Sequence, residues 1–92
     1  MITVKFFSLI RLLIKQNELI LDEKDLTIRE VLQKAQTEIP IKFLFKLLDA
    51  ERELQHGTII MINGKNILHL NKLESMVKDG DIVSLFPPGG GG

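Results

Sequence analysis

The chain contains no cysteine, no tryptophan and no tyrosine. Without cysteine it cannot form a disulfide framework, a thiolate zinc site or a cysteine nucleophile, and this lack is ordinary for a cytoplasmic protein. Long apolar runs are lacking as well: none approaches the roughly 18–20 residues that a membrane span needs. Lys5 and Arg11 interrupt the first apolar stretch, so no secretory signal is predicted. We therefore expect a cytoplasmic protein with no membrane partner.

An excess of charge of either sign is also missing. Twelve Lys and Arg residues balance twelve Asp and Glu residues. Binding to phosphate backbones needs a basic excess on at least one face, so nucleic acid is not expected as the main partner. The length of 92 residues suits one domain, and 45% apolar residues indicate a folded core. A single copy this small is not expected to enclose a deep active-site cavity.

The strongest local signal is the start of a helix at Thr27 and Glu30. This spacing is a capping box, in which each residue bonds the backbone N–H of the other. Apolar residues follow at helical spacing, which predicts one buried stripe, and Pro40 ends the pattern. The stripe consists of Ile28, Val31, Leu32, Ala35 and Ile39.

Alternating apolar residues predict strands before and after this helix. In the first strand Ile2, Val4 and Phe6 share one face and Phe7 lies on the other. The expected elements are strands at 2–9, 18–21, 58–62, 67–70 and 82–86, short helical stretches at 10–16 and 43–48, a solvated loop at 49–56, and turns at 63–64 and 78–81. This order predicts an α+β fold with one mixed sheet and one main helix packed across it.

The chain ends on two prolines and four glycines, Pro87, Pro88 and Gly89 to Gly92. We expect a domain over residues 1–86 and a flexible tail over 87–92. A phosphate-binding glycine loop does not fit, because such loops lead into a helix. A loose terminus is the plain interpretation.

The alternative is a thread without side chains, at most about 20 Å long, that enters a narrow tunnel in a partner. Its terminal carboxylate, with a pKa of roughly 3.5, would be ionised and a poor electrophile. Acyl chemistry at Gly92 would therefore require activation, for instance as an acyl-adenylate.

Several segments together resemble the MoaD family, the small subunits of molybdopterin synthase, which is related to ThiS and to ubiquitin-related modifiers. The combination of Asp-Gly-Asp, Phe-Pro-Pro and a terminal Gly-Gly is specific, and the resemblance covers essentially the whole chain. It is carried by Val4–Phe7, Asn63-Gly64, His69-Leu70, Leu73, Lys78–Asp81, Leu85–Pro88 and Gly91-Gly92.

The resemblance implies a β-grasp, ubiquitin-like fold and a sulfur carrier that has no catalytic residues and binds no cofactor or metal. An E1-like (MoeB-like) partner would use ATP and Mg to adenylate Gly92, and a sulfur donor protein would supply the sulfur of a thiocarboxylate. A MoaE-like large subunit would then receive the tail, through Pro87 to Gly91, and use the sulfur for the dithiolene of molybdopterin. The missing cysteine fits, because sulfur could not be held as a persulfide on this chain.

One departure from the family concerns Gly89 and Gly90, where a small apolar pair is usual. Glycine adds conformational entropy that docking must remove, on the order of 1 kcal/mol per residue. This leaves three alternatives open: a ubiquitin-like modifier joined to lysines, a carrier for another product such as thiazole, thiolated tRNA or cysteine, and an interaction module with an inert tail.

The strand pattern also predicts an apolar surface beside the tail. If the first and last strands are parallel neighbours, then Phe7, Ile59, Met61 and Phe86 lie together on the outer face of the sheet. Patches of this kind usually mark partner interfaces. The competing interpretation is that one strand register differs and these residues belong to the core. His56 and His69 are not expected to bind metal, since no further ligands accompany them.

Overall fold

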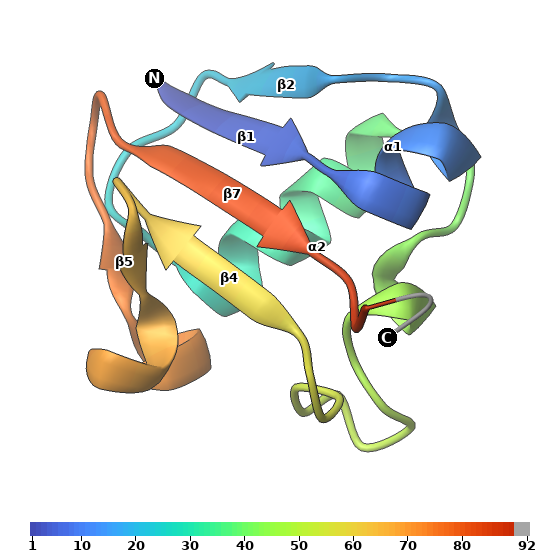
Figure 1. Cartoon of the computed structure of the whole chain (residues 1–92). Coiled ribbons are helices and arrows are strands. Elements are labelled where there is room, and N and C mark those ends of the chain that lie inside the picture. The colour runs from blue at the N-terminus through green and yellow to red at the C-terminus, as the bar shows by residue number, and fades with distance from the viewer. Residues whose placement is uncertain (90–92) are drawn as a thin grey trace.

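A computed structural model of the chain describes residues 1–89. Its main feature is a five-stranded sheet with the strand order β2-β1-β7-β4-β5 (Figure 1). The first strand β1 and the last strand β7 are parallel, and the other neighbours are antiparallel, which confirms the predicted mixed sheet. The strands are β1 (Ile2–Phe6), β2 (Glu18–Leu21), β4 (Ile59–Ile62), β5 (Lys65–Asn66) and β7 (Ile82–Phe86).

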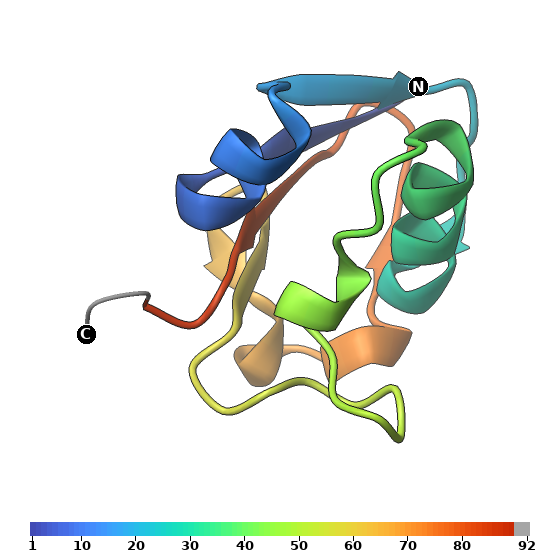
Figure 2. The ribbon, with the colours of Figure 1, turned by 90° about the vertical axis from the view of Figure 1, so that its right-hand side faces the viewer.

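One long helix covers one face of this sheet and leaves the other face open (Figure 2). A small second sheet of β3 and β6 lies beside the start of that helix. The remaining elements are short. They are α1 (Ser8–Ile14), β3 (Leu26–Thr27), β6 (Met76–Val77) and three 3-10 turns, η1 (Leu44–Lys46), η2 (Ile67–His69) and η3 (Lys72–Glu74). The long helix is α2 (Ile28–Glu38). Within residues 1–89, no helix is long and apolar enough to cross a membrane.

Helix α2 begins with the predicted capping box. The Thr27 hydroxyl accepts the N–H of Glu30 at 3.1 Å, and the Glu30 carboxylate accepts the N–H of Thr27 at 2.9 Å. All five residues of the predicted stripe are buried. The helix ends at Glu38, and Ile39 is extended as expected for a residue before proline.

The core lies between α2 and the inner face of the sheet. Ile2, Val4 and Phe6 of β1 and Val83 and Leu85 of β7 are at most 1% exposed. This confirms the alternation predicted for both strands. The Phe6 ring also meets the Phe43 ring edge to face, with 5.5 Å between the ring centres.

The predicted strand at 67–70 is wrong. Asn63 and Gly64 form a two-residue turn with positive φ at both positions, so the chain returns at once and Lys65 pairs with Ile62. The returning strand therefore ends at Asn66. The Asn66 side chain then accepts the N–H of Leu68 at 2.9 Å and starts η2 instead of more strand.

Other elements also differ from the prediction, including α1, which spans Ser8–Ile14 in place of residues 10–16. The first strand ends at Phe6 and not at residue 9, because Ser8 has a φ of 57° and α1 begins there. The stretch 43–48 makes only the single turn η1. The strands β3 and β6 were not predicted, since two residues each are too few to show an alternation.

Candidate functional site

The strand that leads into the tail, β7, occupies the centre of the sheet, between β1 and β4. The ladder with β1 continues past the end of β1, because the N–H of Phe7 donates to the carbonyl of Leu85 at 3.1 Å. On the other side Ile59 lies opposite Phe86. The end of β7 is thus held on both sides at the point where the tail leaves the sheet.

Phe7 and Phe86 are neighbours on the outer face, as predicted. Their rings stack with 4.4 Å between centres and 9° between planes. Both side chains are half-buried. The contact is direct evidence for the parallel register of β1 and β7 and for the outward direction of both side chains.

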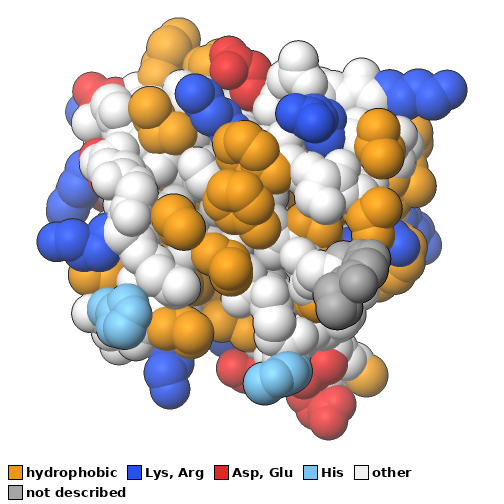
Figure 3. Space-filling model, viewed as in Figure 1, with side chains coloured by type: hydrophobic (Ala, Val, Ile, Leu, Met, Phe, Trp, Pro, Cys, Tyr) orange, Lys and Arg blue, Asp and Glu red, His pale blue; other side chains and the backbone are white. Residues whose placement is uncertain are grey.

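The outer face carries the predicted apolar surface, which we call the sheet patch: Phe7, Ile59, Met61 and Phe86. Ile59 is 38% exposed, and Met61 is half-buried and pairs with Ser84. None of the four belongs to the buried core. Figure 3 shows hydrophobic side chains gathered along the middle of this face. The alternative that these residues belong to the core is therefore ruled out.

The root of the tail lies against the domain. Pro87 is buried, Pro88 is half-buried and Gly89 is exposed. Pro88 approaches Gly57 so closely that a Cβ built on Gly57 would be 3.3 Å from the Pro88 Cβ. The predicted roles of Gly90, Gly91 and Gly92 lie outside the described residues.

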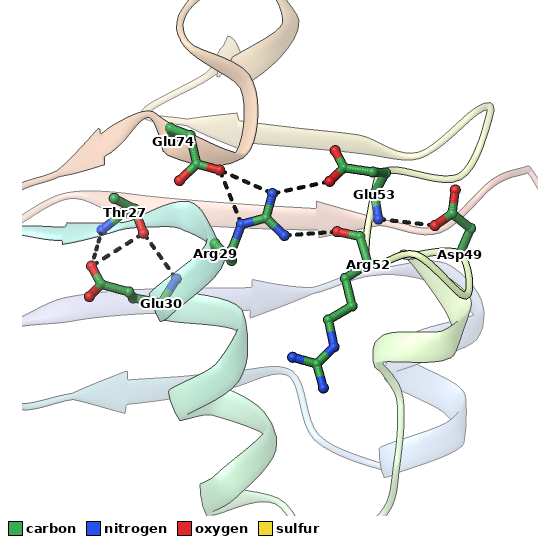
Figure 4. A network of polar contacts seen from close by, with 7 residues as sticks. All are labelled: Thr27, Arg29, Glu30, Asp49, Arg52, Glu53 and Glu74. Carbon is green, nitrogen blue, oxygen red and sulfur yellow. Dashed lines mark hydrogen bonds and ion pairs between the residues drawn. The ribbon is translucent and has the colours of Figure 1, made fainter.

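A polar network fixes the loop that precedes β4, and the sequence analysis missed it (Figure 4). The Arg29 side chain donates from Nε to Glu74 at 3.0 Å and from Nη1 to the carbonyl of Arg52 at 2.9 Å, and its Nη2 lies 3.4 Å from Glu53. Asp49 accepts the N–H groups of Glu51 and Glu53. The run 49–56, predicted as a solvated loop, is therefore tied to α2. The signal available in the sequence was Asp49, a residue type that bonds its own following backbone.

A groove of about 650 Å³ separates α2 from residues 44–55. Leu32, Leu44 and Leu48 line it, together with the exposed side chains of Phe45 and Arg52. Its lining includes no residue of the sheet patch or of the tail root. Groove and patch are thus separate features of the molecule.

The described residues contain no cluster of potential metal ligands. Over positions 1–89, no three His, Asp or Glu side chains come together as metal ligands. The buried hydroxyl of Thr58 donates to the carbonyl of Leu47 at 2.8 Å, and that of Ser75 accepts the N–H of Asn71 at 2.9 Å. His56 and His69 are both exposed. The site therefore consists of an apolar surface and a fixed tail root.

The sequence profile of the ThiS family matches residues 4–92. The chain belongs to the ThiS family. This places it among the ubiquitin-like sulfur carriers and confirms the resemblance that the sequence motifs indicated.

Two curated relatives of this ThiS-family protein are archaeal. A protein of Archaeoglobus fulgidus, named as a candidate sulfur carrier protein, is 34% identical over 79 residues, covering 86% of this chain and 89% of the relative. Small archaeal modifier protein 3 of Haloferax volcanii is 29% identical over 90 residues, covering 97% and 96%. The first name describes a sulfur carrier and the second a modifier protein.

Solved structures confirm the β-grasp fold. A chain of the BexX/CysO complex of Amycolatopsis orientalis superposes with a TM-score of 0.83 over 100% of both chains, at 20% identity. A Pyrococcus furiosus protein, named as a candidate subunit 1 of molybdopterin converting factor, gives a TM-score of 0.65 at 25% identity, covering 95% of each chain. The first likeness concerns the fold alone.

Proposed function

We propose that this ThiS-family protein is a sulfur carrier resembling the small subunit of molybdopterin synthase, with Gly92 as the carrying residue. The observation that supports this most is the placement of the tail root. The tail leaves the central strand β7 beside a half-buried aromatic stack on the outer face, so a partner that docks on the sheet patch also receives the tail. The protein supplies this docking surface and the reacting carboxylate, and its partners supply the catalysis.

The chemistry begins at a carboxylate that must be made electrophilic. An E1-like enzyme, with ATP and Mg, joins the Gly92 carboxylate to AMP and releases pyrophosphate. A persulfide on a donor protein then displaces AMP and forms an acyl disulfide with Gly92. A second thiol on the partner cleaves its S–S bond, which forms a disulfide on the partner and leaves a thiocarboxylate on Gly92. A MoaE-like large subunit transfers the sulfur of this thiocarboxylate to a pterin precursor for the dithiolene of molybdopterin, and water returns Gly92 to a carboxylate. These steps take place in the cytoplasm, where ATP is available.

The glycines have a steric role in this scheme. Residues 89–92 have no side chains, so they can pass through a tunnel that would exclude a Cβ. The sheet patch contributes aromatic and methionine side chains, which are enriched at protein interfaces and can adapt to more than one partner. This suits a carrier that must dock in turn on an activating enzyme and on an acceptor enzyme.

Intact mass spectrometry of the protein isolated from its own host is the first test. We expect a fraction of the chain to carry one sulfur in place of one oxygen, localised to Gly92. Removal of Gly91 and Gly92 should abolish ATP-dependent adenylation by the host's E1-like enzyme and leave the thermal unfolding curve unchanged. An unmodified chain that also resists adenylation would contradict the proposal.

Protein modification is the second candidate, favoured by the similarity to small archaeal modifier protein 3. A modifier and a carrier share the adenylation step and differ in the nucleophile that follows it. A modifier would be found joined through Gly92 to lysine side chains of other proteins. A carrier would be found chiefly as the free thiocarboxylate, and transfer of its sulfur to a pterin precursor in the presence of the large subunit would assign the acceptor.

A further inference from the structure

Gly57 and Pro88 meet where the β4–β7 ladder ends. The register of this ladder pairs Ile59 with Phe86, and continuing it by two residues places Gly57 opposite Pro88. Proline has no N–H to donate, so the ladder cannot continue by hydrogen bonding at this point. In place of a further ladder bond, Gly57 and Pro88 lie so close together that a Cβ built on Gly57 would touch Pro88.

This contact requires glycine at position 57 for two reasons. The φ of Gly57 is +93°, a conformation that L side chains rarely adopt. A Cβ there would also lie 3.3 Å from the Pro88 Cβ and 3.5 Å from the Pro88 Cα. The first distance is tighter than ordinary contact, so either Pro88 or the turn that holds Gly57 would have to move.

The turn is the more firmly held of the two. The N–H of Thr58 donates to the carbonyl of Gln55 at 3.0 Å, which closes a four-residue turn with Gly57 in third place. The buried Thr58 hydroxyl bonds to the carbonyl of Leu47, and the N–H of Gln55 donates to the same carbonyl at 2.9 Å. The Gln55 side chain bonds to the carbonyl of Leu48 at 3.0 Å. A side chain at position 57 would therefore push Pro88 away by a few tenths of an ångström.

We propose that Gly57 is a positioning residue for the C-terminal tail. Its lack of a side chain lets Pro88 rest against the 55–58 turn, and this contact sets the direction in which the chain leaves the sheet at Gly89. The inference rests on the proposed function, since it assigns Gly57 a part in presenting Gly92 to the activating enzyme. Gly57 touches no reacting atom, and it acts only through Pro88.

The test compares Gly57→Ala with Gly80→Ala. Gly80 has nearly the same φ, +91°, but a Cβ there would meet nothing within 4 Å. Both variants carry the same kind of backbone strain, and only the first displaces the tail. Their free energies of unfolding should fall by similar amounts, which controls for folding.

The kinetic measurement is ATP-dependent adenylation of Gly92 by the host's E1-like enzyme. We expect Gly57→Ala to raise the KM for the carrier about three- to tenfold, because the apparent affinity falls with the fraction of molecules whose tail points correctly. The kcat should stay within about twofold, because the enzyme holds the tail once it has entered. Gly80→Ala should change neither constant beyond about twofold.

A Pro88→Gly background shows whether the effect passes through Pro88. Adding Gly57→Ala to this background should raise the KM little further, since the displaced side chain is gone. A full further increase would overturn the proposal. So would equal KM values for Gly57→Ala and Gly80→Ala.

Nuclear magnetic resonance separates this inference from the proposed function. In the unmodified protein we expect a nuclear Overhauser effect between Gly57 and Pro88 protons, lost in Gly57→Ala together with the order of the Gly89 amide. If the unmodified protein is not adenylated, the proposed function fails, and this measurement still decides whether Gly57 holds the tail root. If the unmodified protein shows no nuclear Overhauser effect between Gly57 and Pro88, that result alone overturns the inference.

Discussion

The two faces of β7 differ in what covers them, although both are largely apolar. Val83 and Leu85 point inward and are completely buried, while Ile82 is 37% exposed on the outer face and Phe86 is half-buried there. Helix α2 packs against the inner face, and the outer face is open in Figure 2. Apolar residues on the inner face therefore stabilise the fold, and those on the outer face are available for binding.

Two adjacent phenylalanines show the same difference at the level of single residues. Phe6 is 1% exposed and meets Phe43 edge to face inside the core. Phe7 points to the other side of the sheet and stacks on Phe86. One step along the chain thus separates a residue of the core from a residue of the sheet patch, which we propose as the docking surface.

The largest effect should come from the inner face. Leu85→Ala removes a completely buried side chain and should lower the free energy of unfolding by about 2–5 kcal/mol. Ile82→Ala, on the outer face of the same strand, should cost less than half as much. Chemical denaturation of both variants measures the difference, and equal losses would contradict the division between the two faces.

An effect on binding should come from the outer face. Phe86→Ala removes the stacked pair at the tail root and should weaken binding to the E1-like partner about tenfold, or ~1.4 kcal/mol, as truncation of an interface aromatic does. Isothermal titration calorimetry gives the dissociation constant. Phe45→Ala is the matched control, because Phe45 is 59% exposed and lies outside the sheet patch. Equal weakening by both variants would show that the patch has no special role.

The smallest effect should come from the start of α2. Thr27→Ala removes the hydroxyl of the capping box and should lower the free energy of unfolding by about 1 kcal/mol. The partner affinity of the folded protein should be unchanged, since the cap lies on the covered side of the sheet. Thermal unfolding measures the loss of stability, and the same titration measures the partner affinity. A loss of affinity would contradict the assignment of binding to the outer face.

Regular patterns in the sequence were sufficient to predict much of the fold. The capping box, the helical stripe and the alternation in β1 and β7 each follow from local spacing. The outward direction of the four residues of the sheet patch follows from the same alternation. The wrong strand at 67–70 arose where a side chain bonds to nearby backbone, because Asn66 starts η2 in place of a strand. The run 49–56 is exposed for the most part, as a solvated loop should be, and its attachment to Arg29 was not predicted.

The sequence by itself determined which side of each long strand is apolar, where α2 begins and ends, and that a run of glycines follows two prolines. Those features depend on residues close together in the chain. Only the tertiary structure decided that Gly57 faces Pro88 and that Arg29 holds the loop before β4. These contacts join residues 31 and 23 positions apart, and no local pattern encodes them, because they depend on how the strands and α2 pack together.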